Sequence, residues 1–197
     1  MDTGRLEAFS DGVIAIIITI AILIIDVPNG NDWPDIAAIL PIIICYVISF
    51  IVVGTYWVNH HHLLQATKHV DGRILWANLM FLMFLSFFPV TTGWVGKSGF
   101  SMIPVRVYVL VNLADALSYI ILERAIMHSH DCEVFQDEMS NRRKELWTLS
   151  IELLALLVSF SPEFHHLSCL MLVVAVAPWI IPDLRIKRVL DQTRNER

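Results

Sequence analysis

The chain has 197 residues, of which 56% are hydrophobic and 17% are charged, and its mean hydropathy is +0.62. These values exclude an ordinary soluble domain, and a formal net charge of −5 without a basic domain argues against a nucleic-acid partner. We therefore predict that residues 1–197 form a single all-α integral membrane domain. Cys45, Cys132 and Cys169 show neither a disulfide framework nor the spacing of a zinc site.

The first apolar segment carries charged residues at its start. We predict a helix over residues 6–27, whose roughly 20 residues cross about 30 Å of hydrocarbon only if Glu7 and Asp11 enter the membrane too. An unpaired carboxylate at that depth costs about 3 kcal/mol or more, so we expect these acids to have partners. The segment lacks the basic start and the small-residue cleavage site of a signal peptide, which predicts that it is retained.

Five further apolar segments follow, separated mainly by polar turns. They predict helices over residues 36–58, 74–95, 104–126, 146–160 and 167–181. Pro89 is expected to kink the third helix and Pro178 to bend the end of the sixth, because proline has no N–H to donate. The stretch Thr91–Ser98 is similar to a potassium-filter sequence, but no re-entrant helix precedes it, so we expect no selectivity-filter loop.

The basic residues predict the orientation of the chain. With the N terminus in the cytosol, only Lys97 and Arg106 of the 14 Lys and Arg residues fall in outer loops. This asymmetry is what the positive-inside rule predicts for an even number of spans with both termini in the cytosol. The basic tail that begins at Arg185 either lies against anionic lipid headgroups or serves only as a topology signal.

The start of the first helix carries the motif R-x-x-x-F-S-D. It resembles the opening of the first helix in the transmembrane protein 175 family, which comprises lysosomal-type potassium channels and their bacterial relatives. The stretches from Trp57 to His61 and from Asn78 to Pro89 resemble the second and third helices of the bacterial members, whereas beyond Pro104 the resemblance rests on helix number. The motif residues are Arg5, Phe9, Ser10 and Asp11.

The resemblance implies a potassium-preferring cation channel in a bacterial cell membrane, built as a homotetramer of six-helix subunits. It implies no enzyme activity and no cofactor, only permeant K⁺ and contacts with membrane lipids. Ile16, Thr19 and Leu23 match the pore-facing positions of the family. A ring of Ile16 side chains would gate by dewetting, and Thr19 hydroxyls would sharpen the preference for K⁺. From the sequence alone, a shared stripe on one helix favours helix packing, and the family motif reverses this preference.

The charged residues of the motif predict a polar network. Arg5 and Asp11 are six residues apart, too far for a direct pair along one helix, so each is expected to bond to a neighbouring helix. We predict that donors to Ser10 and Asp11 set the position of the first helix. The candidates lie at the inner ends of the second and third helices and are Trp57, Asn59, His60, His61 and Asn78.

Two other functions are compatible with the sequence. Asp115 and Glu152 are predicted at similar depths in the fourth and fifth helices, where two buried carboxyl groups that share a proton would suit a proton-coupled transporter. The stretches His60–His62 and His128–Cys132 loosely resemble the histidine boxes of di-iron membrane enzymes. The histidine spacing differs from that of those enzymes, and the repeats typical of transporters are not visible.

Overall fold

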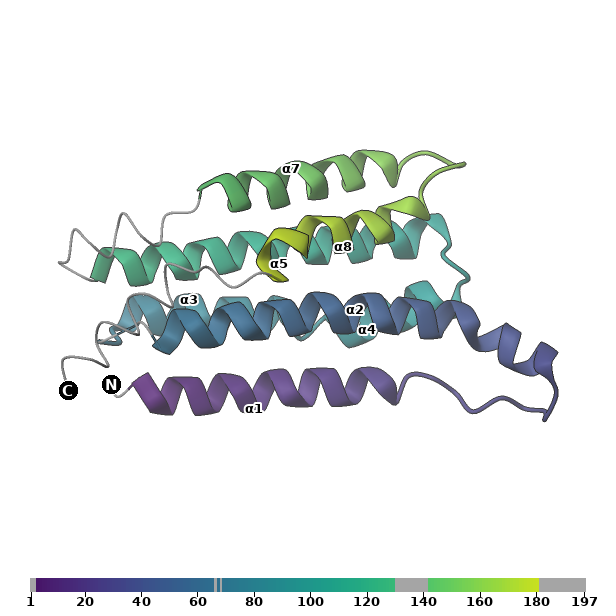
Figure 1. The fold of residues 1–197 in the computed structure, drawn as a ribbon, viewed down its shortest axis with the longest axis horizontal. Coiled ribbons are helices and arrows are strands. Elements are labelled where there is room, and N and C mark those ends of the chain that lie inside the picture. Colours follow the sequence, from purple (N-terminus) through teal and green to yellow (C-terminus); the bar gives the residue numbers. More distant parts are fainter. Residues whose placement is uncertain (1–2, 66, 68, 130–141, 181–197) are drawn as a thin grey trace.

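The computed structural model describes residues 3–65, 67, 69–129 and 142–180, and its regular structure there is entirely α-helical. The helices lie side by side along the long axis of the molecule (Figure 1). Their bounds are α1 Thr3–Ile22, α2 Trp33–Gln65, α3 Gly72–Leu85, α4 Phe88–Lys97, α5 Met102–Ser129, α7 Arg142–Val158 and α8 Leu167–Ile180. Because α3 and α4 are the two halves of one broken segment, the described chain has six helical segments, as the sequence predicts.

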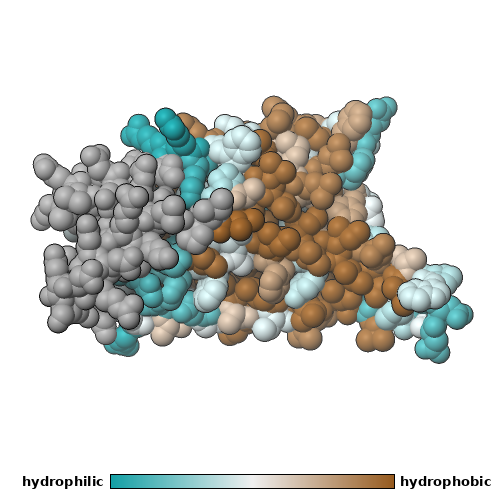
Figure 2. Space-filling view, in the orientation of Figure 1, coloured by the Kyte–Doolittle hydropathy of each residue, from teal (hydrophilic) through white to brown (hydrophobic). Residues whose placement is uncertain are grey.

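Three segments are long and apolar enough to cross a membrane: α2, the broken segment Gly72–Lys97, and α5. Helix α8 is apolar but shorter, and the first half of α1 carries Arg5, Glu7 and Asp11. Figure 2 shows a broad hydrophobic surface along the molecule, with hydrophilic residues towards its ends. A surface of this kind is stable in hydrocarbon and not in water, so the protein is a multi-pass membrane protein.

Several helix ends differ from the predicted ones. Helix α1 ends at Ile22, so Leu23 lies in the turn that follows. Helix α2 continues to Gln65, beyond the predicted end at residue 58, because His60, Leu63 and Leu64 are buried against the rest of the bundle. The fifth predicted helix starts earlier than expected, at Arg142.

The break between α3 and α4 follows from Pro89. Proline cannot donate to the carbonyl four residues earlier, and its ring clashes with that carbonyl, which here belongs to Leu85. Helix α3 accordingly ends at Leu85 and α4 begins at Phe88, with Pro89 in its first turn. The predicted kink at Pro89 is therefore a full break in the helix.

Pro178 has no N–H to donate to the carbonyl of Val174, four residues earlier in α8, and a side chain of α7 donates to it instead. The indole Nε1 of Trp147 donates to the Val174 carbonyl at 3.1 Å, and the hydroxyl of Thr148 donates to the next carbonyl, that of Ala175, at 3.0 Å. Inside hydrocarbon each unsatisfied carbonyl would cost several kcal/mol, so these bonds fix α7 against α8.

A buried polar cluster joins α2, α4 and α5. The hydroxyl of Ser49 lies 2.6 Å from that of Thr92 and 2.7 Å from that of Tyr108. Nearby, α4 approaches α2 so closely at Gly96 that an added Cβ atom would lie 2.5 Å from the Cα atom of Ile42. Small residues of this kind let helix backbones pack tightly in membranes.

Replacing Gly96 with alanine should therefore destabilise the fold. The new methyl group would meet the backbone of α2, which is unable to move aside as a flexible side chain would. We therefore expect the free energy of unfolding to fall by about 1–3 kcal/mol. Thermal unfolding of the purified protein measures this loss. The matched control is Gly72→Ala, since an added Cβ atom there meets nothing within 4 Å. Equal melting temperatures for the two variants would contradict the close contact.

Candidate functional site

Helix α1 has one face buried in the subunit and one face exposed. The exposed fractions of Ile16 and Leu23 are 57% and 78%, and Thr19 is also exposed. At 3.6 residues per turn, Ile16 and Thr19 lie about 120° and 180° round the helix axis from the centre of the buried face, and Leu23 follows in the turn after α1. The buried residues are Leu6, Ser10, Ile14, Ile17 and Ala21. The predicted pore residues therefore form a stripe that the subunit itself leaves uncovered.

The hydroxyl of Thr19 is oriented by its own helix. Its Oγ1 atom donates to the carbonyls of Ala15 at 2.9 Å and Ile16 at 3.0 Å. Because the hydroxyl proton is engaged by the backbone, the oxygen presents lone pairs to its surroundings. An oxygen with exposed lone pairs is able to act as a ligand for a cation.

A buried chain of hydrogen bonds holds the base of α1 against α2 and α3. The amide Nδ2 of Asn78 donates to the hydroxyl oxygen of Ser10 at 3.0 Å, and its Oδ1 lies 2.7 Å from Nε2 of His60. All three side chains are fully buried, and the His60 ring stacks on Phe81 with a centroid distance of 5.4 Å. This chain links one residue from each of the three helices.

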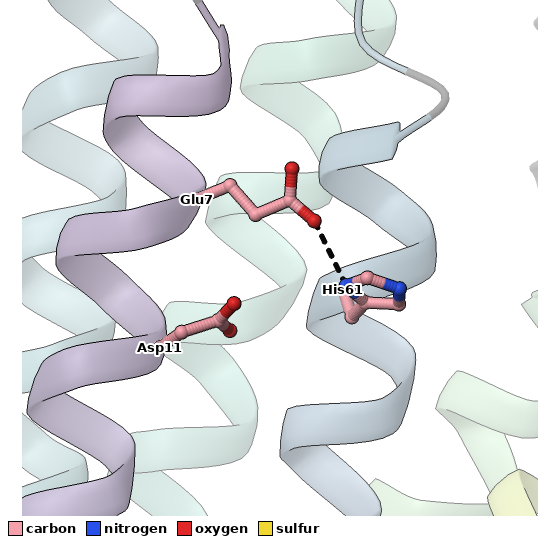
Figure 3. Close-up of side chains that lie close together, drawn as sticks. All are labelled: Glu7, Asp11 and His61. Carbon is pink, nitrogen blue, oxygen red and sulfur yellow. Dashed lines mark ion pairs between the residues drawn. The ribbon is translucent and has the colours of Figure 1, made fainter.

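A second set of contacts joins the acids of α1 to α2. The indole Nε1 of Trp57 donates to Oδ1 of Asp11 at 2.9 Å. Oε1 of Glu7 lies 2.8 Å from Nδ1 of His61, and Figure 3 shows both carboxylates directed towards the His61 side of α2. The rings of Trp57 and His61 are stacked, with centroids 6.0 Å apart.

The remaining motif residues lie elsewhere. Arg5 and Phe9 are exposed, and Asn59 donates to the carbonyls of Thr55 and Trp179 instead of contacting α1. Glu7 is absent from the predicted network although it contacts His61. Its position one helical turn before Asp11 is the signal that places it on the same face.

The two candidate proton-sharing carboxyl groups are both buried. Asp115 in α5 is 0% exposed and Glu152 in α7 is 1% exposed, and these helices pack against each other. Neither oxygen of Asp115 has a hydrogen-bond partner among the described residues, and neither does Oε2 of Glu152. Burying carboxyl groups without hydrogen-bond partners costs free energy, so these two groups are candidates for a functional role.

Comparison with known proteins decides the family. The family model for the endosomal/lysosomal potassium channel TMEM175 matches residues 5–89. A potassium channel of Chryseobacterium sp. (strain P1-3) is 42% identical over 193 residues, which cover 98% of this chain and 100% of that protein. The chain belongs to the TMEM175 family of potassium channels. A Streptomyces collinus potassium channel is 39% identical over 126 residues, 60% of this chain and 61% of its own length.

The TMEM175 fold extends over nearly the whole chain. The crystal structure of a lysosomal potassium-selective channel TMEM175 homologue from Chamaesiphon minutus matches with a TM-score of 0.76 and 26% identity. The match covers 89% of this chain and 96% of that one. The resemblance inferred from the R-x-x-x-F-S-D motif is thus confirmed, including the part of the chain beyond Pro104.

Membership of the TMEM175 family also removes the metalloenzyme alternative, because this is a family of channels and not of enzymes. His130 and Cys132 of the second histidine stretch lie outside the described residues. In the first stretch, His60 and His61 bond to different partners, Asn78 and Glu7. These contacts are those of a helix-packing network rather than of a histidine box.

Proposed function

We propose that the protein is a potassium-preferring cation channel of a bacterial plasma membrane and that it acts as a homotetramer whose α1 helices line the pore. The observation that carries this proposal is the exposed stripe Ile16, Thr19 and Leu23, which lies away from the buried face of α1. One stripe does not enclose a pore, whereas several copies around a rotation axis do. The resemblance of the motif to the bacterial members implies four copies.

Ile16 would form the narrowest ring of this pore. Branched aliphatic groups offer an ion nothing in exchange for its hydration water, so such a ring closes by dewetting and conducts when it widens. Potassium loses water more easily than sodium, which gives the ring a modest preference for potassium. The Thr19 oxygens, one turn away, would replace part of the lost hydration shell.

The arrangement of the described basic residues supports the predicted orientation. The start of α1, the end of α5 and the start of α7 lie at the same end of the molecule (Figure 1). These ends carry Arg5, Arg124 and Arg142, as expected for a cytosolic side with the N terminus inside. The filter-like stretch from Thr91 to Lys97 is helical within α4, which supports a pore without a carbonyl filter.

Ion flux from liposomes tests the proposal. Purified protein is reconstituted, and potassium efflux is measured under a potassium gradient, then repeated with sodium and with a pH gradient alone. We expect potassium flux to exceed sodium flux without any proton gradient. Crosslinking of the reconstituted protein should give bands up to four subunits. Absence of potassium flux, or a largest crosslinked species below four subunits, would contradict the proposal.

Proton-coupled transport is the second candidate, and the buried, unpartnered carboxyl groups of Asp115 and Glu152 favour it. It predicts flux that appears only when a pH gradient is imposed. It also predicts that Glu152→Gln abolishes this coupled flux. The same liposome experiment therefore separates the two functions.

Replacing Thr19 with alanine should lower the ratio of potassium to sodium permeability. The change removes the outward-facing hydroxyl oxygen while leaving the helical backbone bonds in place. Reversal potentials under bi-ionic conditions measure the ratio, and Thr19→Ser is the control because it keeps the hydroxyl. An unaltered ratio in the alanine variant would show that Thr19 serves helix packing and not ion selectivity.

A further inference from the structure

Three metal-ligating side chains converge where the start of α1 meets the end of α2. One ligand atom each from Glu7, Asp11 and His61 lies within 4.8 Å of the other two (Figure 3). The Nδ1 atom of His61 lies 2.8 Å from Oε1 of Glu7, the distance of an ion pair when the ring is protonated. When the ring is neutral and its proton is on the other nitrogen, Nδ1 offers a lone pair to a cation held beside the carboxylates.

His61 is the basic side chain that forms a described ion pair with a carboxylate of this cluster, that of Glu7. Glu7 and Asp11 are one helical turn apart, so their carboxylates repel each other. The ion pairs of Lys97 with Asp26 and of Arg124 with Glu145 do not involve the cluster. A divalent cation would neutralise both carboxylates at once.

We propose that Glu7, Asp11 and His61 form a binding site for a divalent transition-metal cation such as zinc, which ties α1 to α2. Imidazole nitrogen suits zinc and its transition-metal neighbours, whereas magnesium and calcium prefer oxygen ligands alone. Three protein ligands with one position left for water is a normal zinc arrangement. Donors on two helices make the cation a crosslink between them.

The geometry fits a cation of this size after a small side-chain adjustment. Ligand atoms around tetrahedral zinc, at about 2.0–2.2 Å from the metal, lie about 3.3–3.6 Å from one another. The distances in the cluster lie on both sides of this separation. Oε1 of Glu7 and Nδ1 of His61 are 2.8 Å apart, and the three ligand atoms all lie within 4.8 Å of one another. Trp57 holds the cluster in place, since it donates to Oδ1 of Asp11 and stacks on the His61 ring. Ligand residues in metal sites are commonly oriented by such outer contacts.

A cation here would act on the pore, and this step rests on the proposed function. Ile16 lies nine residues beyond Glu7 on the same continuous helix, which is about 13.5 Å along its axis. Fixing the base of α1 against α2 would restrict the widening that an apolar ring needs in order to conduct. The bound state is therefore the one of lower potassium flux.

Direct binding tests the site independently of channel activity. The full-length protein, freed of any histidine tag and of metal, is placed in lipid nanodiscs and titrated with Zn²⁺ by calorimetry, and with Co²⁺ by visible absorption. We expect one metal per subunit and no competition from Mg²⁺ or Ca²⁺. Glu7→Gln and His61→Gln should each weaken binding at least tenfold, because even outer contacts of metal sites are worth about 10–100-fold. His62→Gln is the matched control, as the neighbouring histidine lies outside the cluster, and should bind as the wild type does.

Three outcomes would overturn the site: no binding, binding that survives both ligand variants, or binding lost equally in His62→Gln. Thermal unfolding of each variant confirms that it is folded. A second readout is stabilisation, because Zn²⁺ should raise the melting temperature of the wild type and not that of Glu7→Gln. In liposomes, Zn²⁺ should reduce the potassium flux of the wild type and leave that of Glu7→Gln unchanged. Specific binding without any potassium flux would support the site and contradict only the proposed channel function.

Discussion

Replacing Ile16 with asparagine should raise the single-channel conductance several-fold and bring the ratio of potassium to sodium permeability towards unity. The side chain is 57% exposed on the face of α1 that the subunit leaves uncovered. A ring of asparagine side chains would keep water in the constriction. Ions would then cross it with more of their hydration shell, and the constriction would not close by dewetting. Planar-bilayer recordings under symmetric and bi-ionic conditions measure both quantities.

The control for this experiment lies on the same helix. Ile22 is 50% exposed, close to the value for Ile16, but it lies about 120° round the helix axis from Ile16. Ile22→Asn should leave the conductance and the selectivity close to those of the wild type. Unchanged currents in a well-folded Ile16→Asn variant would show that Ile16 does not line the pore. Equal effects of the two substitutions would indicate a general disturbance of α1.

The helices themselves could be predicted because their signals are local. Each apolar segment is long and bounded by polar turns, and Pro89 alone explains why the third segment divides into α3 and α4. The contacts of Asp11 with Trp57 and of Ser10 with Asn78 could also be anticipated, since an acid at membrane depth and a buried hydroxyl require partners at the same depth.

The ends of the helices depend on distant packing and could not be predicted in the same way. The apolar run continues through Ile25 without a breaker, yet α1 ends at Ile22. There Ile24 packs tightly on Gly93 of α4, and Asp26 forms an ion pair with Lys97 at 2.8 Å. Neither contact has a local signal in the sequence.

The histidine run at the end of α2 shows the same limitation for the site. Histidine is polar, so the stretch from Asn59 onwards resembles a loop, whereas His60 is fully buried and His61 is only partly so. Which ring contacts Asn78 and which contacts Glu7 depends on the rotation of α2 relative to α1 and α3. That rotation is set by the whole bundle.

Replacing Asn78 with leucine should destabilise the subunit by about 2 kcal/mol or more, because it leaves the buried His60 ring and the Ser10 hydroxyl without their partner. We expect a lower melting temperature and loss of the proposed tetramer on sizing. The double variant Asn78→Leu with His60→Phe should recover part of the loss, since removing both partners of a buried bond is far less costly than removing one. A phenylalanine at position 60 would also keep the stacking on Phe81, which lies 5.4 Å from the His60 ring. If the double variant lost as much stability as the two single variants together, Asn78 and His60 would act independently, and the buried chain would not be what holds α1 against α2 and α3.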